Sequence, residues 1–119
     1  MMNNTRRTVL LAIIIIVALI ICILCYFFYD MNSLPKGELL ESIESPTNEY
    51  TINSYIVRNS LSADAIRVEL INNKTTKRKN IYWGYPENIA DIKWRDKETV
   101  EINEHVLNIH KDIYDWRKQ

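Results

Sequence analysis

The feature that most constrains this chain is an unbroken apolar run near its amino end. Val9 to Tyr29 comprises 21 residues without a charge, and most of them are Ile, Leu or Val. As a helix these residues extend about 31 Å, close to the hydrocarbon thickness of a bilayer. The run therefore predicts that residues 1–29 form a short stub and a transmembrane helix, with the lipid bilayer as the partner of residues 9–29.

The flanks of the run predict that it is retained and how it is oriented. Its length exceeds the apolar centre of a removable signal peptide, about 7–15 residues, and no Ala-x-Ala pattern follows it. Arg6 and Arg7 precede the run, whereas only Lys36 lies within about 15 residues after it. We therefore expect a single-pass signal-anchor protein of the cell membrane, with a cytoplasmic amino terminus and an extracytoplasmic carboxyl-terminal domain.

Both cysteines, Cys22 and Cys25, lie inside the apolar run, so no disulfide can hold the rest of the chain. A redox Cys-x-x-Cys motif needs an electropositive and water-accessible setting, which hydrocarbon does not provide. We interpret both cysteines as small apolar residues, with lipid modification of either thiol left open.

After the run, the hydrophobic pattern changes from continuous to alternating. Residues 30–45, which include Pro35 and Gly37, are interpreted as a juxtamembrane connector, although residues 38–45 carry a weak strand signal. Residues 46–119 are interpreted as one small domain. The strands expected there are residues 50–57, 65–71, 80–85, 91–95, 99–102 and 105–109.

The pattern therefore predicts a mainly β fold, in which a transmembrane helix precedes a small antiparallel sheet of six to seven short strands arranged as a meander. One face is expected to be packed by an amphipathic segment or by the curl of the sheet itself. Ile66, Val68 and Leu70 share that face, whereas Arg67 and Glu69 lie on the other. Asn103-Glu104 is expected to form a two-residue hairpin because Asn tolerates positive φ.

The charge pattern argues against nucleic-acid binding. The chain has 15 basic and 15 acidic residues, and its only short basic cluster is Lys77-Arg78-Lys79. Nucleic-acid binding usually requires a concentrated basic face. We interpret the cluster as the solvated end of a hairpin.

The sequence contains little that could perform catalysis, so we predict no enzyme, no catalytic residue, no metal and no cofactor. His105 and His110 are five residues apart, which on a strand places them on opposite faces. With two glycines, the chain cannot build a phosphate-binding loop. A hydrolase using carboxylates such as Asp91 and Glu101 is the alternative, and it requires two of them to face one cleft.

Aromatic residues are the more informative set, and core packing is their default role. If Trp83 and Tyr85 face the core, Tyr82 faces away from it, because adjacent strand residues alternate. Tyr and Trp are enriched in protein-binding surfaces. We therefore expect Tyr82 and Trp116 to project from the sheet and form a recognition surface.

Several blocks after the apolar run are similar to a known family. They are Asp30-Met31-Asn32-Ser33-Leu34-Pro35-Lys36-Gly37-Glu38-Leu39, Ser45-Pro46, Ala65-Ile66-Arg67-Val68-Glu69-Leu70, Lys79-Asn80-Ile81-Tyr82-Trp83, Ala90-Asp91-Ile92-Lys93-Trp94 and Tyr114-Asp115-Trp116-Arg117. These blocks resemble a family of small bacterial membrane-anchored proteins that is catalogued only as a domain of unknown function. The resemblance implies a membrane tether and a bacterial cell envelope, and it brings no activity, cofactor or catalytic residue.

One turn departs from the pattern of that family. Where its members tend to carry Ser-Pro-Asp-Gly-Lys-Tyr, this chain has Ser45-Pro46-Thr47-Asn48-Glu49-Tyr50. Without the Asp-Gly pair, the turn must use Asn48.

The leading functional hypothesis is a binding or accessory module for another envelope protein or an envelope component. The alternatives are the carboxylate-dependent envelope hydrolase and an immunity-like membrane subunit that acts through its span. Nothing in the sequence identifies an oligomeric state.

Overall fold

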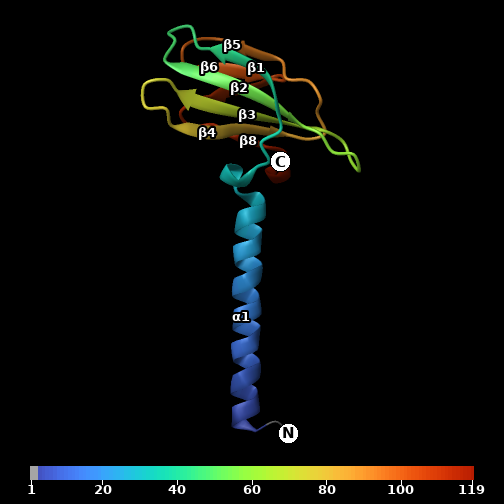
Figure 1. Cartoon of the computed structure of the whole chain (residues 1–119). Coiled ribbons are helices and arrows are strands. Elements are labelled where there is room, and N and C mark those ends of the chain that lie inside the picture. Colours follow the sequence, from blue (N-terminus) through green and yellow to red (C-terminus); the bar gives the residue numbers. More distant parts are fainter. Residues whose placement is uncertain (1–2) are drawn as a thin grey trace. The chain divides into compact units, whose positions relative to one another are not determined.

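The computed structural model describes residues 3–119, and the chain divides into two compact units, Met1–Ser33 and Leu34–Gln119. The first unit contains the helix α1 (Asn4–Tyr29) and a 3-10 turn, η1 (Met31–Ser33) (Figure 1). Asn3 caps α1, because its side-chain oxygen accepts the backbone N–H of Arg6 at 2.8 Å. Asn4–Phe27 is long and apolar enough to cross a membrane, a property that anchors share with signal sequences.

The second unit contains a five-stranded sheet in the order β1-β2-β3-β4-β8. Its strands are β1 (Glu38–Glu44), β2 (Tyr50–Val57), β3 (Ala65–Asn72), β4 (Arg78–Gly84) and β8 (Tyr114–Asp115). Neighbouring strands are antiparallel except for β4 and β8, which pair in parallel. The turn between β1 and β2 does use Asn48, whose φ is 60°.

Three further strands form a separate antiparallel sheet in the order β5-β6-β7 (Figure 1). They are β5 (Ile92–Trp94), β6 (Thr99–Ile102) and β7 (His105–Asn108), and the chain ends with a 3-10 turn, η2 (Trp116–Lys118). The predicted fold class is confirmed: an apolar amino-terminal helix precedes strands that are mostly antiparallel.

The core lies between the two sheets. The larger sheet contributes side chains from β2, β3 and β4, and the smaller sheet contributes side chains from β5, β6, β7 and the residue after β7. The buried cluster comprises Ile52, Ile56, Ile66, Val68, Leu70, Ile81, Tyr82, Ile92, Val100, Ile102, Leu107 and Ile109. A second sheet therefore covers the apolar face, in place of the amphipathic segment or the sheet curl expected from sequence.

The folded unit extends into the range that the sequence assigned to the connector. β1 pairs with β2 from Glu38 opposite Ile56 to Glu44 opposite Thr51. Gly37 precedes β1 with φ 76°, and a Cβ atom there would collide with the backbone of Ile56. This close approach lets the incoming segment lie against the sheet.

Arg67 fastens that segment to the sheet. It lies on the face opposite the core, as alternation predicts, yet only 5% of its surface is exposed. Its guanidinium donates to the carbonyl of Lys36 from Nη2 at 2.9 Å and to Oδ1 of Asn80 from Nη1 at 2.8 Å. It also lies 3.6 Å from Glu69 and 4.0 Å from the centroid of the Tyr55 ring.

We expect Arg67→Met to lower the free energy of unfolding of the β unit by about 2–4 kcal/mol, because it removes a buried guanidinium together with its hydrogen bonds to Lys36 and Asn80. Urea unfolding of the full chain in nonionic micelles measures this, since all three tryptophans lie in the β unit. Arg58→Met is the matched control. The side chain of Arg58 is 61% exposed. Loss of its ion pairs should therefore lower the free energy of unfolding by no more than about 0.5 kcal/mol. Equal losses in the two variants would contradict the role assigned to Arg67.

Candidate functional site

Tyr82 does not project from the sheet, and the prediction that it faces away from the core is wrong. Val68 pairs with Tyr82, whereas the next residue of β3, Glu69, pairs with Asn80, so Ile81 is an extra residue in β4. This bulge shifts the alternation by one position, because the strand gains a residue without a partner. Tyr82 therefore lies opposite a core residue and is completely buried, whereas Trp83 lies on the face of Arg67.

The buried phenol of Tyr82 links the two sheets through Glu87. The Tyr82 hydroxyl donates to the Glu87 carboxylate, and it lies 2.5 Å from Oε2. Asn103, at the β6–β7 turn, donates from Nδ2 to Glu87 Oε1 at 2.9 Å and to the Ile89 carbonyl at 2.8 Å. Gly84 leaves room for this carboxylate, since a Cβ atom there would collide with it.

Burial raises the pKa of Tyr82 well above its ordinary value, and the hydrogen bond and negative charge of Glu87 raise it further. The phenol is therefore held in its neutral form as a donor. The ring also stacks on Tyr114 with 4.9 Å between centroids, and His105 stacks on the same Tyr114 ring at 4.0 Å. This arrangement is a packed structural cluster in which the Tyr82 hydroxyl has an acceptor.

Trp116 is 38% exposed, and its ring lies 4.8 Å from that of Tyr85 between centroids. It follows Asp115, whose buried carboxylate pairs with Arg117 at 2.8 Å. Burial by itself raises the pKa of Asp115, but the hydrogen bonds from Arg117 outweigh it and hold that pKa below its usual range. Recognition by Trp116 stays a prediction.

The two histidines lie in different surroundings. His105 packs on Tyr114, whereas His110 is exposed beside Tyr50, with 5.9 Å between ring centroids, and lies 3.7 Å from Glu98. Within residues 3–119, no group of three His, Cys, Asp or Glu side chains is arranged to hold a metal ion.

The carboxylates named for a hydrolase each have a basic partner. Glu101 accepts from Arg95 at 2.7 Å, and Asp91 lies 3.9 Å from Lys93. The strand register places Lys93 directly opposite Glu101. Because each carboxylate is balanced in this way, the arrangement is that of ion pairs along one face of the small sheet.

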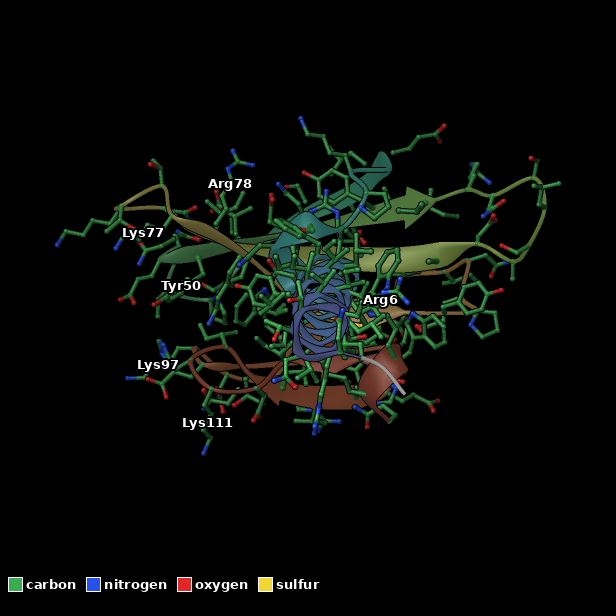
Figure 2. The ribbon with its side chains drawn as sticks, turned by 90° about the horizontal axis from the view of Figure 1, so that it is seen from below. Arg6, Tyr50, Lys77, Arg78, Lys97 and Lys111 are labelled. Atoms are coloured by element: carbon green, nitrogen blue, oxygen red, sulfur yellow. The ribbon has the colours of Figure 1, made fainter. Side chains whose placement is uncertain are left out.

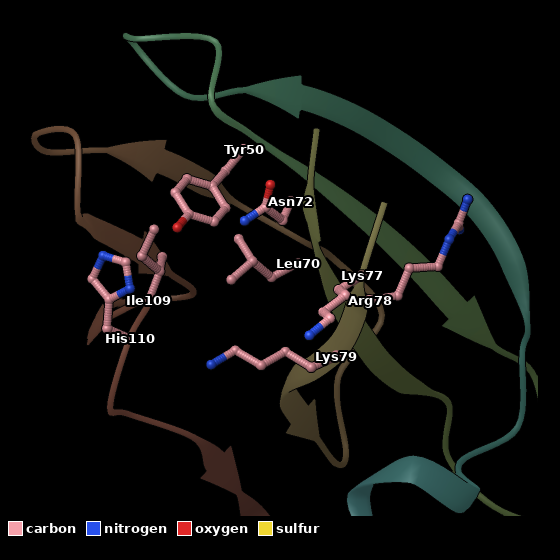
Figure 3. Close-up of a pocket in the computed structure, with 8 residues that line it drawn as sticks. All are labelled: Tyr50, Leu70, Asn72, Lys77, Arg78, Lys79, Ile109 and His110. Carbon is pink, nitrogen blue, oxygen red and sulfur yellow. The ribbon is translucent and has the colours of Figure 1, made fainter. Parts of the chain in front are cut away.

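A cleft of about 340 Å³ lies where the β3–β4 hairpin meets the segment after β7 (Figure 3). We call it the basic cleft, and its lining consists of Tyr50, Leu70, Asn72, Lys77, Arg78, Lys79, Ile109 and His110. Buried Leu70 and Ile109 make an apolar floor, and polar side chains surround it.

The side chains of the basic run 77–79, which was predicted to be the solvated end of a hairpin, point in two different directions. Arg78 points away from the cleft and bonds Glu69 at 3.0 Å, whereas Lys79 pairs opposite the core residue Leu70 in the strand register (Figure 3). Lys77, which directly precedes β4, and Lys79 both extend on the cleft side (Figure 3). Among the described residues, neither lysine ammonium group has an ion pair.

Two neutral donors accompany these lysines. Tyr50 turns its hydroxyl toward the His110 side of the cleft (Figure 3). The side-chain oxygen of Asn72 accepts the backbone N–H groups of Lys74 and Thr75 at 3.0 and 3.1 Å, and its amide nitrogen lies on the cleft side. In the sequence, the only sign of this site was the spacing of Lys77 and Lys79. That spacing indicates a cleft only once the pairing of β3 with β4 shows that Lys79 lies on the core side of the large sheet.

The cleft lies at a basic end of the β unit. In Figure 2, Lys77, Lys97 and Lys111 lie toward the same end as Tyr50. Carboxylates also lie at this end, among them those of Glu98 and Asp96. Glu98 lies beside His110, and Asp96 accepts backbone N–H groups in the β5–β6 turn, which lower its pKa.

Residues 4–119 match the model of a family described as a family of unknown function, DUF5412. The chain belongs to this family. No match was found among curated proteins or among solved structures. The match confirms a domain of unknown function, while the bacterial origin and membrane nature implied by the resemblance stay predictions.

We expect Tyr82→Phe to lower the free energy of unfolding at pH 8 by about 1–2 kcal/mol, because Glu87 loses a buried donor. The folded-state pKa of Tyr82 is raised, so this stabilisation is complete below the unfolded pKa of about 10 and is lost as the pH rises above it. Urea unfolding between about pH 8 and 11 should therefore show the gap between the native chain and Tyr82→Phe shrinking. A constant gap would contradict the buried neutral phenol.

The β6–β7 turn offers a matched pair of glycine variants. Asn103 and Glu104 have φ values of 45° and 71°, which confirms the predicted hairpin. Asn103→Gly keeps the backbone shape but removes the bonds to Glu87, Ile89 and the Asp91 N–H, so we expect a loss of about 1–3 kcal/mol.

Glu104→Gly instead removes the strain of a side chain on a backbone in the left-handed region. We expect the free energy of unfolding to rise by about 1 kcal/mol. The same urea titration measures both variants. If Asn103→Gly is as stable as the native chain or more stable, the side-chain bonds of Asn103 do not hold the loop.

Proposed function

We propose that this protein is a membrane-anchored binding module rather than an enzyme. In this proposal α1 spans the cell membrane of a bacterium, the amino terminus is cytoplasmic, and the β unit is extracytoplasmic. The β unit binds another envelope protein or an envelope component through the basic cleft.

The anchor is supported by the surroundings of α1. None of the apolar window in Asn4–Phe27 is buried inside the protein, whereas the apolar helix of a soluble core would be mostly buried. Isoleucine, leucine and valine side chains of α1 are about half exposed along its length. Exposure of this much apolar surface is unfavourable in water, so the helix requires lipid around it.

The basic cleft is the observation that carries the binding role. It combines an apolar floor, an aromatic ring and two lysines without ion pairs, and such a mixture of apolar surface with few polar groups is typical of ligand sites. Its polar groups are donors suited to holding a ligand. A hydrolytic role would instead need a carboxylate pair, and Asp91 and Glu101 each have a basic partner.

A photocrosslinking amino acid placed at the rim of the cleft tests this role. We expect the full chain carrying His110→p-benzoylphenylalanine to form a discrete adduct after illumination of the cells that naturally express it. His110 is exposed at the rim, so its replacement leaves the cleft floor in place. Val106→p-benzoylphenylalanine is the matched control, because Val106 is 52% exposed and does not line the cleft. It should form no such adduct.

Two outcomes would contradict the proposal. Equal crosslinking from His110 and Val106 would show that the cleft is not the site of contact. Recovery of a shortened chain without α1 in the soluble fraction would show that α1 acts as a cleaved signal. Protease added outside the same cells should remove the β unit, and complete protection would reverse the proposed orientation.

A further inference from the structure

We propose that the basic cleft binds a phosphate group carried by a small organic ester, whether a lipid headgroup or a water-soluble phosphate ester. This inference rests on the proposed binding role and names the chemistry of the ligand. The cleft offers two ammonium groups, from Lys77 and Lys79, and two neutral donors, from Tyr50 and Asn72.

The charge at the cleft is not already neutralised. Neither Lys77 nor Lys79 has an ion pair among the described residues, whereas Arg78, between them in sequence, is bonded to Glu69 on the opposite face of the sheet. On the side of the small sheet, the carboxylate of Glu98 lies 3.7 Å from His110 Nε2, at the rim of the cleft. Two uncompensated ammonium groups beside an apolar floor attract an anion, because the nearby low-dielectric surface strengthens their field.

The type of donor favours phosphate over carboxylate. A planar carboxylate pairs best with the flat fork of a guanidinium, and the arginine of this lining points away. Lysine acts as a point charge with freely rotating donors, and it is a frequent partner of phosphate. Donors that come from β2, the end of β3 and β4 approach from several directions, which suits the tetrahedral arrangement of phosphate oxygens.

The rest of the cleft suits an organic body rather than a bare ion. Its volume of about 340 Å³ exceeds what one small anion fills, and volumes of this order hold small organic ligands. Leu70 and Ile109 give the floor its apolar surface, and the ring of Tyr50 forms one wall. The glycerol part of an ester would lie against these side chains while the phosphate bonds the lysines.

Titration with glycerol 3-phosphate tests the inference directly. The full chain, with methyl-labelled Leu and Ile, is placed in micelles of dodecyl maltoside, a nonionic detergent whose headgroup carries no phosphate. We expect saturable shifts of the Leu70 and Ile109 methyl signals below about 20 mM ester, corresponding to a millimolar dissociation constant. Glycerol at the same concentrations should produce no such shifts, because it lacks the charge.

Two double variants separate a built site from general attraction. Lys77→Gln/Lys79→Gln should weaken binding at least about tenfold, since each charged hydrogen bond to the phosphate is lost. Lys97→Gln/Lys111→Gln removes the same charge at the same end without altering the cleft lining, and it should weaken binding less than about twofold at physiological salt. Tyr50→Phe keeps the ring and removes one donor, so we expect an intermediate loss.

A second arm identifies the source of the phosphate. In nanodiscs that contain phosphatidylglycerol, shifts of the Leu70 and Ile109 methyls without added ester, abolished by Lys77→Gln/Lys79→Gln, would assign the site to a lipid headgroup. Absence of these shifts, with the soluble ester still binding, would assign it to a soluble phosphate ester. Both outcomes support a phosphate site.

The inference is overturned if no saturable shift occurs, or if the two double variants weaken binding equally. These results differ from failure of the proposed binding role. A cleft that crosslinks through His110 but ignores glycerol 3-phosphate binds its partner by other chemistry, whereas a cleft that binds the ester without crosslinking has a small-molecule ligand.

Discussion

The tie between Tyr82, Glu87 and Asn103 joins the two sheets of the β unit. Tyr82 fills the core from the large sheet, while Asn103 follows the second strand of the small sheet. The carboxylate between them accepts from both. These two hydrogen bonds favour one position of the loop that carries Glu87. The small sheet is thereby held over the core in a unit without any disulfide.

The opposite face of the large sheet is organised by a second polar centre. Arg67 is buried on that face, where it bonds the Lys36 carbonyl and Asn80 and lies over Tyr55. The segment that leads into β1 is therefore part of the fold and not a free connector. The two faces of the large sheet are thus covered differently. Apolar side chains of the small sheet pack against one face, and the hydrogen-bonded guanidinium of Arg67 lies on the other.

The basic cleft is a consequence of this two-sheet arrangement. Tyr50 and Lys79 belong to the large sheet, whereas Ile109 and His110 follow the small one. Because the sheets hold these residues at one end of the core, the lysines that face inward meet the apolar floor instead of an acidic partner. Because DUF5412 is a family of unknown function, the proposal of a ligand rests on the chemistry of the cleft.

The apolar helix, most of the strands and the hairpin at Asn103-Glu104 could be predicted from the amino-acid sequence, because continuous apolar runs, period-two alternation and the φ tolerance of Asn are local properties. The roles of the side chains near the core depend instead on how the strands pair and pack. The extra residue at Ile81 reversed the face of Tyr82, since a bulge is set by pairing with β3 and is not visible in the sequence pattern. Burial of Arg67 and the opening of the cleft beside Lys77 likewise depend on segments distant in sequence, which local patterns cannot bring together.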